Sequence, residues 1–384
     1  MSKTPLPRAT YIKTTEDLKA LAKTLSRESL LAIDTEANSM HAYQEQVCLV
    51  QISSRSADYI IDPLEVTDMS PLASLMASGD IEKIFHAAEY DVMIMKRDFG
   101  YEFCNIFDTM IAARIVGYEA FGLGSLLKHH LGVKADKSHQ RDNWGLRPLA
   151  QGSLRYAQMD THYLPTLRDI LNEELKAGGH LPEAHETFRE LESLPAANGR
   201  SFDPEGYWKL GIPRTLKHTQ MKILRELYLM RDEFARDRDR PSFKVIDNKV
   251  LVDIAENAPH TLRDLRKIHG MTNSQIRRYG NRIIDAVRNG EIADHLPTPP
   301  HHHPPAPEIT ERYIALHQWR KERAIKRGVE SDIIVSKQTL WDLAYQVPES
   351  IEALSEIRGL GPWRLKTYGA ELLVLMQEFR SAGD

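Results

Sequence analysis

The segment Leu30–Ala37 decides the fold of the first half of the chain, and it reads Leu-Leu-Ala-Ile-Asp-Thr-Glu-Ala. Its continuous apolar run predicts a buried strand, and the two-residue period of a strand puts Asp34 and Glu36 on one face at the strand end. Adjacent carboxylates repel each other unless cations neutralise them or one group is protonated. Taken alone, the pair fits equally well with a strand end that runs into solvent.

Two further acidic segments follow at other predicted junctions. Asp91 comes after an apolar run that passes through small residues into a helical stretch, a strand-to-helix position where ligand-bearing residues often lie. Tyr156 and Asp160 are four residues apart, so a helix puts both side chains on one face. Each segment alone has a simpler explanation, such as a helix-start charge at Asp91. The ordered set of four carboxylates and a tyrosine is what metal-assisted phosphodiester hydrolysis requires.

The helix that carries Tyr156 and Asp160 is expected to continue and to dock on a core. Pro165 has no N–H for the carbonyl of Thr161, so a kink is expected just after Asp160. Gly178-Gly179 is expected to end the helix. Its apolar stripe consists of Leu164, Leu167, Leu171 and Leu175.

Composition limits the class of protein. The 384 residues allow two or three domains, and 42% hydrophobic with 27% charged residues is ordinary for a globular chain. The N-terminus has no apolar leader and no stretch has the length of a membrane span, which predicts a cytoplasmic protein without a membrane partner. Cys48 and Cys104 are expected as buried, reduced thiols. The net charge of −4 argues against coating of nucleic acid by bulk attraction. The absence of a G-x-x-x-x-G-K-[ST] loop argues against helicase work, and no nucleotide cofactor is expected.

The second half of the chain repeats itself at an offset of 89 residues. Val252-Asp253-Ile254-Ala255 recurs as Trp341-Asp342-Leu343-Ala344. The same offset relates further pairs without a gap: Arg231 and Arg320, Pro259 and Pro348, Ile268 and Ile357, Gly270 and Gly359, and Tyr279-Gly280 and Tyr368-Gly369. Both copies have the 3.6-residue periodicity of helices, so a duplicated helical module is predicted.

Linkers rich in proline separate these parts. We expect a first domain over residues 8–194, a linker over 195–213, copy 1 of the module over 214–294, a second linker over 295–307 and copy 2 over 308–380. The second linker is rich in Pro and His, which favours an extended polyproline II spacer between the copies.

On these residues the chain resembles the ribonuclease D family, within the DEDD superfamily of 3′-to-5′ exonucleases that have tyrosine in the third motif. Asp34 and Glu36 match its first motif, Asp91 the second, and Tyr156 with Asp160 the third. Other matching segments are Phe107-Asp108-Thr109, Asp136-Lys137-Ser138, Trp144 and Arg147-Pro148-Leu149. Both copies of the repeat resemble the HRDC domain. The resemblance implies an α/β ribonuclease H-like exonuclease domain, a mixed sheet flanked by helices, followed by two all-α HRDC modules.

One position departs from the family pattern. The family usually has Asp immediately before the tryptophan, whereas this chain has Asn143, with Asp142 one place earlier. The position is not one of the four metal ligands, so the departure concerns the geometry of a loop.

The acid set and the resemblance together predict in-line hydrolysis of a terminal phosphodiester with two Mg²⁺ or Mn²⁺ ions, since hard cations prefer oxygen ligands. One ion, held by Asp34 and Asp160, would position a water, and the other, held by Asp34, Glu36 and Asp91, would stabilise the leaving 3′ oxygen. Tyr156 would orient the water by a hydrogen bond, because an ordinary tyrosine pKa of about 10 makes phenolate scarce at neutral pH. The resemblance implies release of nucleoside 5′-monophosphates.

RNA with a free 3′ end is the expected partner of a monomeric enzyme, with transfer RNA precursors or other structured RNA as the processing substrate. Arginines beside the Gly270 turn can bind phosphates as a set, although interspersed acids favour a solvated helix face for any one of them. Tyr279 or Trp363 can stack on unpaired bases. A DNA-directed exonuclease of the same superfamily and a non-catalytic RNA-binding protein stay open as alternatives. The candidate substrate contacts are Thr35, His86, Arg266, Lys267, Arg277, Arg278, Tyr279 and Trp363.

Overall fold

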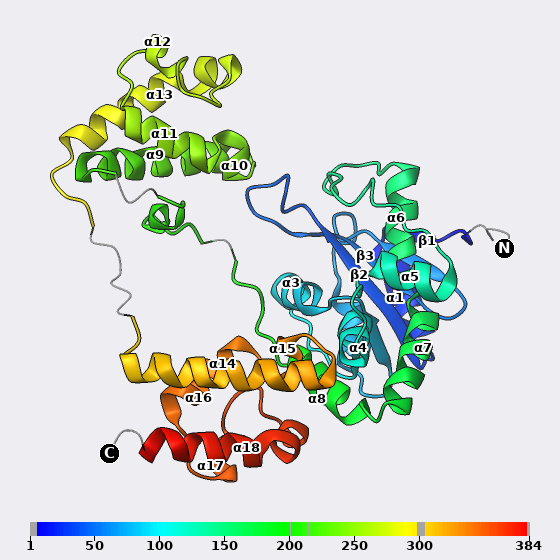
Figure 1. Ribbon diagram of the computed structural model, residues 1–384. Helices are drawn as coiled ribbons and strands as arrows, with labels where there is room; N and C mark the ends of the chain where they lie inside the picture. Colours follow the sequence, from blue (N-terminus) through cyan, green and yellow to red (C-terminus); the bar gives the residue numbers. More distant parts are fainter. Residues whose placement is uncertain (1–5, 200, 213–215, 298–303, 382–384) are drawn as a thin grey trace. The chain divides into compact units, whose positions relative to one another are not determined.

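The computed structural model describes residues 6–199, 201–212, 216–297 and 304–381 (Figure 1). These residues divide into two compact units. The first unit comprises the N-terminal residues up to Glu36, the segment Val47–Ala197 and the residues from Pro304 onward, and the second comprises Ala37–Gln46 and residues 198–303. Among the described residues, no helix combines the length and the hydropathy that a membrane crossing needs.

The centre of the first unit is a six-stranded sheet in the order β1-β4-β3-β2-β5-β6. Pairs β1–β4, β2–β5 and β5–β6 are parallel and β3–β4 is antiparallel, so the sheet is mixed, as predicted. Four buried residues at the start of β2 explain its position inside the sheet, since both of its faces are covered. The strands are β1 Thr10–Ile12, β2 Leu30–Ala37, β3 Val47–Ser53, β4 Asp58–Ile61, β5 Glu82–Phe85 and β6 Ile106–Asp108.

Helices cover the sheet and supply the rest of its core. A cluster of buried side chains joins Ile84 of β5 and Phe107 of β6 to helices α4 and α7. A smaller cluster joins Cys48 and Leu49 of β3 to Ala157 of α6. The elements between and after the strands are α1 Thr15–Leu25, η1 Ser70–Leu72, α2 Ala73–Ala77, α3 Glu89–Phe99, α4 Thr109–Val116, α5 Leu123–Leu131, α6 Gln151–His162, α7 Leu164–Ala177 and α8 Leu181–Glu192.

The structure corrects the expectation of one kinked helix through Asp160 and Leu175. Two helices occupy this stretch, because α6 ends at His162 and α7 begins at Leu164. Pro165 stands in the first turn of α7, where its missing N–H costs nothing. The leucine stripe belongs to α7 alone and is buried, so α6 is positioned by other contacts.

The two helical copies fold alike, and both confirm the predicted duplication. The five helices of copy 2 each begin 89 residues after their counterparts in copy 1. Copy 1 consists of α9 His218–Asp237, α10 Ser242–Val245, α11 Asn248–Asn257, α12 Leu262–Leu265 and α13 Asn273–Ile292, preceded by η2 Gly206–Lys209. Copy 2 consists of α14 Pro307–Arg327, α15 Ser331–Ile334, α16 Lys337–Gln346, α17 Ile351–Ser355 and α18 Pro362–Ser381. Residues 298–303 of the linker expected as a polyproline spacer lie outside the described residues.

Copy 2 packs against helix α8 within the first unit. Arg364 is 4% exposed and contacts Glu186 at 3.2 Å and Glu190 at 2.7 Å. Arg327 contacts the buried Glu183 at 2.5 Å. A further pair of contacts joins Arg114 of α4 to Glu330 and Asp332 at 2.7 Å. Buried ion pairs therefore fix copy 2 to the sheet domain.

Candidate active site

Three carboxylates meet where β2 and α6 approach each other. Asp34 and Glu36 come from the end of β2, and Asp160 comes from the last turn of α6. One oxygen from each lies within 4.8 Å of the others, and all three side chains are partly exposed. The strand period and the helix therefore bring these predicted ligands together, at a point that solvent can reach.

The fourth predicted carboxylate joins them through a hydrogen bond. Asp91 lies in the first turn of α3 and is 7% exposed. Its Oδ1 accepts a hydrogen bond from the hydroxyl of Thr35, which stands between Asp34 and Glu36. The structure thus places Thr35 as a support for Asp91, in addition to its predicted place beside the substrate.

The charges of the four acids are costly in this arrangement. Burial, together with the charges of Asp91, Asp160 and Glu36, raises the pKa of Asp34 well above its usual range. Burial and neighbouring acids raise the pKa of Glu36 to about 9. Burial raises the pKa of Asp91 and of Asp160 to about 7. Such a set is stable at neutral pH when it binds protons or cations, and its donors are all oxygens, which fit Mg²⁺ or Mn²⁺.

Tyr156 lies one helical turn before Asp160 on α6 and stays protonated. Burial and the charges of Asp160, Glu36 and Asp34 raise its pKa far above the ordinary value. A hydrogen bond from its hydroxyl lowers the pKa of Asp160 against the effect of burial. The phenol is therefore a hydrogen-bond donor at the site and cannot serve as a base near neutral pH.

His86 stands at the end of β5, next to the turn that leads to α3. Its Nδ1 lies 3.0 Å from the hydroxyl of Thr109, and that hydroxyl donates to the carbonyl of Phe85 at 2.9 Å. Because the hydroxyl proton is used, Nδ1 must donate, which leaves Nε2 as the acceptor. Burial lowers the pKa of His86, so the ring is neutral.

Polar contacts fix α6 to the sheet, and no local sequence pattern predicts them. Asp58 of β4 accepts hydrogen bonds from Gln158 at 2.6 Å and from His162 at 2.9 Å. Ser53 of β3 bonds Thr161 at 2.7 Å in a buried contact. These residues lie on both sides of Asp160 along α6, so they hold the helical turn that presents the carboxylate.

The loop with the family departure also reaches the site. Asp142 accepts hydrogen bonds from His139 at 2.8 Å and Ser153 at 2.6 Å, and its charge adds to the raised pKa of Glu36. Asn143 accepts a hydrogen bond from the N–H of Gly145 at 3.2 Å, which is a contact within the loop. Asp142 is therefore the acid of this loop that influences the site.

The predicted contacts in the helical copies fall into two groups. Arg266, Lys267, Arg277 and Arg278 are exposed on copy 1, in the second unit. Tyr279 is 4% exposed and packs on Phe234 with ring centroids 4.8 Å apart, which corrects the expectation that its ring stacks on bases. Trp363 of copy 2 is partly buried: Arg327 lies over its ring, and its backbone N–H donates to Glu186 at 2.6 Å.

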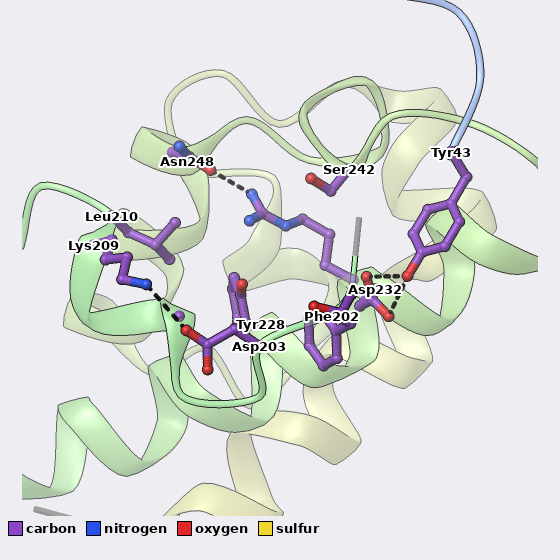
Figure 2. A pocket seen from close by; sticks show the side chains of 12 residues that line it. Tyr43, Phe202, Asp203, Lys209, Leu210, Tyr228, Asp232, Ser242 and Asn248 are labelled. Carbon is purple, nitrogen blue, oxygen red and sulfur yellow. Dashed lines mark hydrogen bonds and ion pairs between the residues drawn. The ribbon is translucent and has the colours of Figure 1, made fainter. Parts of the chain in front are cut away.

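The second unit contains a cavity of about 350 Å³, and none of the four acids is among its lining residues (Figure 2). Tyr43, Phe202, Tyr228 and Asp232 are among its lining residues. Its polar groups contact one another: Tyr43 donates to Asp232 at 2.8 Å, Lys209 contacts Asp203 at 3.1 Å, and Arg231 donates to Asn248 at 2.7 Å. Because these groups contact one another and Tyr43 reaches Asp232, we interpret the cavity as a space left where Ala37–Gln46 packs on copy 1.

Family models match both the sheet domain and the two helical copies. Residues 9–176 match a family model described as 3′-5′ exonuclease. Residues 220–287 and 310–375 match the HRDC domain model. The first match contains all five residues of the predicted catalytic set.

Individual relatives match about three quarters of the chain or more. Ribonuclease D of Gluconacetobacter diazotrophicus is 31% identical over 289 residues, which cover 74% of this chain and 73% of that protein. Protein RRP6-like 1 of Arabidopsis thaliana is 32% identical over 304 residues, 75% of this chain, and the match spans only 46% of that longer protein. The crystal structure of Escherichia coli RNase D, described as an exoribonuclease involved in structured RNA processing, has 26% identity and a TM-score of 0.68, covering 97% of this chain and 99% of that one.

Proposed function

The chain belongs to the ribonuclease D family of exoribonucleases, and from this premise we propose that it removes nucleotides from the 3′ end of RNA by metal-dependent hydrolysis. The products would be nucleoside 5′-monophosphates. The observation that carries the proposal is the group Asp34, Glu36 and Asp160, whose oxygens lie within 4.8 Å of one another.

The residues present fit two divalent cations, Mg²⁺ or Mn²⁺. Asp34 and Asp160 would hold one ion, and Asp34, Glu36 and Asp91 would hold the other. Such ions lower the pKa of a bound water and neutralise charge on the phosphodiester oxygens. Repulsion among the acids, visible in the raised pKa of each, supports the assignment because cation binding relieves it.

The chain's own side chains supply orientation. Tyr156 would donate a hydrogen bond to the attacking water, a role that agrees with a hydroxyl that stays protonated. The neutral His86 would offer Nε2 as an acceptor to a sugar hydroxyl of the terminal nucleotide, since Nδ1 is engaged with Thr109. Thr35 would hold Asp91 in place through its hydrogen bond.

Structured RNA such as transfer RNA precursors is the substrate we propose, processed in the cytoplasm by a monomeric enzyme. The exposed basic residues of copy 1, Arg266, Lys267, Arg277 and Arg278, would contact phosphates of the RNA body. Phosphate contacts of this kind increase affinity without reading sequence, which suits an enzyme that trims several RNAs.

Turnover by acid variants tests the proposal. Asp34→Asn, Asp91→Asn and Asp160→Asn should each abolish Mg²⁺-dependent shortening of a single-stranded RNA with a free 3′ end. Asp169→Asn on α7, an exposed carboxylate paired with Arg55, is the matched control and should keep full activity. Near-native turnover by any of the first three would refute the metal assignment.

The same assay separates the alternatives. A DNA strand of the same sequence should be shortened more slowly than the RNA, and a circular RNA should resist cleavage. Equal or faster degradation of DNA would indicate a DNA-directed exonuclease. Absence of metal-dependent cleavage together with RNA binding would indicate a non-catalytic RNA-binding protein.

A further inference from the structure

The carboxylate of Asp108 lies at the end of β6 and has no exposure to solvent. It caps helix α4, because its Oδ1 accepts the N–H groups of Met110 at 2.8 Å and Ile111 at 3.0 Å. An aspartate in this position is common, since it satisfies donors that have no partner inside the helix.

The same carboxylate binds a second helix start. Strands β5 and β6 are paired so that Phe85 lies opposite Asp108, and the turn after β5 therefore passes over the Asp108 side chain. Its Oδ1 accepts the N–H of Ala87 at 3.3 Å, and its Oδ2 accepts the N–H of Ala88 at 2.6 Å. Four backbone donors from the starts of α3 and α4 thus converge on one buried acid.

This turn has a backbone conformation that its sequence does not favour. Ala87 has a φ of 66°, in the left-handed region where a Cβ is strained. Such a conformation persists only when the surrounding contacts hold it. The hydrogen bonds to Asp108 are contacts of this kind, and α3 begins two residues later with Asp91 in its first turn.

We propose that Asp108 is a positioning residue for the metal site: it holds the Ala87-Ala88 turn so that α3 presents Asp91 to Thr35 and to the other acids. The role rests on the proposed function, since it concerns the site assigned there to metal ions. Asp108 acts through Asp91 and has no contact with substrate in this arrangement.

Two substitutions of Asp108 weaken its hydrogen bonds to the Ala87-Ala88 turn, and they differ in the size and the acceptor atoms of the side chain that remains. Asp108→Ser can still cap α4 with its hydroxyl but has one oxygen on a shorter side chain, so it loses the bond to Ala88. Asp108→Asn keeps the size and replaces one acceptor oxygen by a donor. Supporting residues around metal ligands typically change metal affinity by 10- to 100-fold, and we expect at least a tenfold increase in the dissociation constant for Mn²⁺.

The experiment measures Mn²⁺ binding to the full chain by electron paramagnetic resonance, with circular dichroism as the check of folding. Asp247→Ser is the matched control, since Asp247 caps α11 of copy 1 through the N–H of Lys249 at 2.9 Å. It should leave Mn²⁺ binding unchanged. Adding Ala87→Gly to Asp108→Ser should recover affinity, because glycine adopts the left-handed turn without strain.

The recovery distinguishes positioning from a general loss of structure, which Ala87→Gly would not repair. Wild-type affinity in a folded Asp108→Ser or Asp108→Asn variant would overturn the proposal, and so would a failure of Ala87→Gly to recover binding. Absence of Mn²⁺ binding in the wild type would refute the metal site itself, so the two proposals fail in distinguishable ways.

Discussion

The two HRDC copies have the same interior and different surfaces. In each copy a buried arginine donates to a backbone carbonyl 15 residues ahead: Arg231 to Ile246 at 3.0 Å and Arg320 to Val335 at 3.1 Å. Ala258 and Val347, which end α11 and α16, both have left-handed backbone, with φ of 42° and 43°. Corresponding buried residues therefore give both copies the same helical fold.

The surfaces diverge at corresponding positions. Gln275 of copy 1 donates to the carbonyl of Val245 at 2.9 Å, and Arg364 of copy 2 makes the corresponding bond to Ile334 at 3.0 Å. Arg364 then continues to Glu186 and Glu190 of α8. Six basic residues of copy 1, Arg263, Arg266, Lys267, Arg277, Arg278 and Arg282, correspond to Glu352, Ser355, Glu356, Lys366, Thr367 and Glu371. Copy 2 therefore docks on α8 through an arginine that copy 1 lacks, and the exposed charges of the two copies differ.

The largest expected difference between the copies concerns Arg364. Arg364→Ala leaves Glu186, which is 5% exposed, without its buried partner, and breaking such a pair costs about 3–5 kcal/mol. Gln275→Ala removes one hydrogen bond in copy 1 and should cost about 1 kcal/mol. Urea unfolding of both variants measures the two free energies. Equal losses would show that copy 2 gains nothing from docking on α8.

The next prediction concerns the metal site in the first unit, where the acids should make stability depend on pH and on Mg²⁺. Burial raises the pKa of Asp91 and Asp160 to about 7 and of Glu36 to about 9, so the folded state holds extra protons. A carboxyl whose pKa rises on folding lowers the free energy of unfolding as pH rises from about 4 through its folded pKa. The metal-free protein should therefore be less stable at pH 8.5 than at pH 6, and Mg²⁺ should raise the melting temperature more at the higher pH.

Bound Mg²⁺ should also stabilise copy 2 against local unfolding, whereas copy 1 should be unaffected. A metal present at a hundred times its dissociation constant adds about 2.7 kcal/mol to the folded state. Because buried contacts join copy 2 to α8, hydrogen exchange in α18 should slow with Mg²⁺, whereas exchange in α13 should not change. Slower exchange in both helices, or in neither, would contradict this assignment.

Much of this arrangement could be predicted from sequence because it depends on local periodicity. The strand period placed Asp34 beside Glu36, and the helix period placed Tyr156 beside Asp160. The fold class and the duplication were likewise predicted and are confirmed. Neither the break between α6 and α7 nor the burial of Tyr279 was predicted, since both depend on packing between distant segments.

Asp58 and Asp108 show even more clearly that contacts between distant segments cannot be predicted from local sequence. Asp58 and Asp108 hold the helices that carry Asp160 and Asp91, yet each contacts residues at least 20 positions away in sequence. Nothing in the local pattern distinguishes Asp108 from any aspartate before a helix. The docking of Arg364 on Glu186 spans 178 positions and could not be deduced from either sequence neighbourhood.

Substitution of a turn glycine should destabilise the two copies by smaller and similar amounts. Gly270 and Gly359 have φ of 87° and 84°, and an added Cβ would lie 2.7 Å from Val250 and 2.5 Å from Thr339. Replacement by alanine forces a left-handed backbone that costs about 1–2 kcal/mol, with local crowding in addition. Gly270→Ala and Gly359→Ala should therefore destabilise the protein by similar amounts in urea unfolding. A difference above about 1 kcal/mol would mean that the interiors are less alike than their backbones.

The smallest effect concerns the exposed charges of copy 1. If Arg277 and Arg278 contact phosphates of structured RNA, the variant with both changed to Gln should bind more weakly and with a shallower dependence on salt. Each lost contact should reduce the slope of log K against log salt by about 0.7–0.9, because fewer counterions are released. Lys366→Gln is the matched control: Lys366 is exposed at the position of copy 2 that corresponds to Arg277, among acidic neighbours that should keep RNA away. Filter binding of a transfer-RNA-sized substrate at several salt concentrations gives both slopes. A slope unchanged in the double variant would favour a solvated helix face on copy 1, and equal reductions in both variants would mean that the two surfaces contact RNA alike.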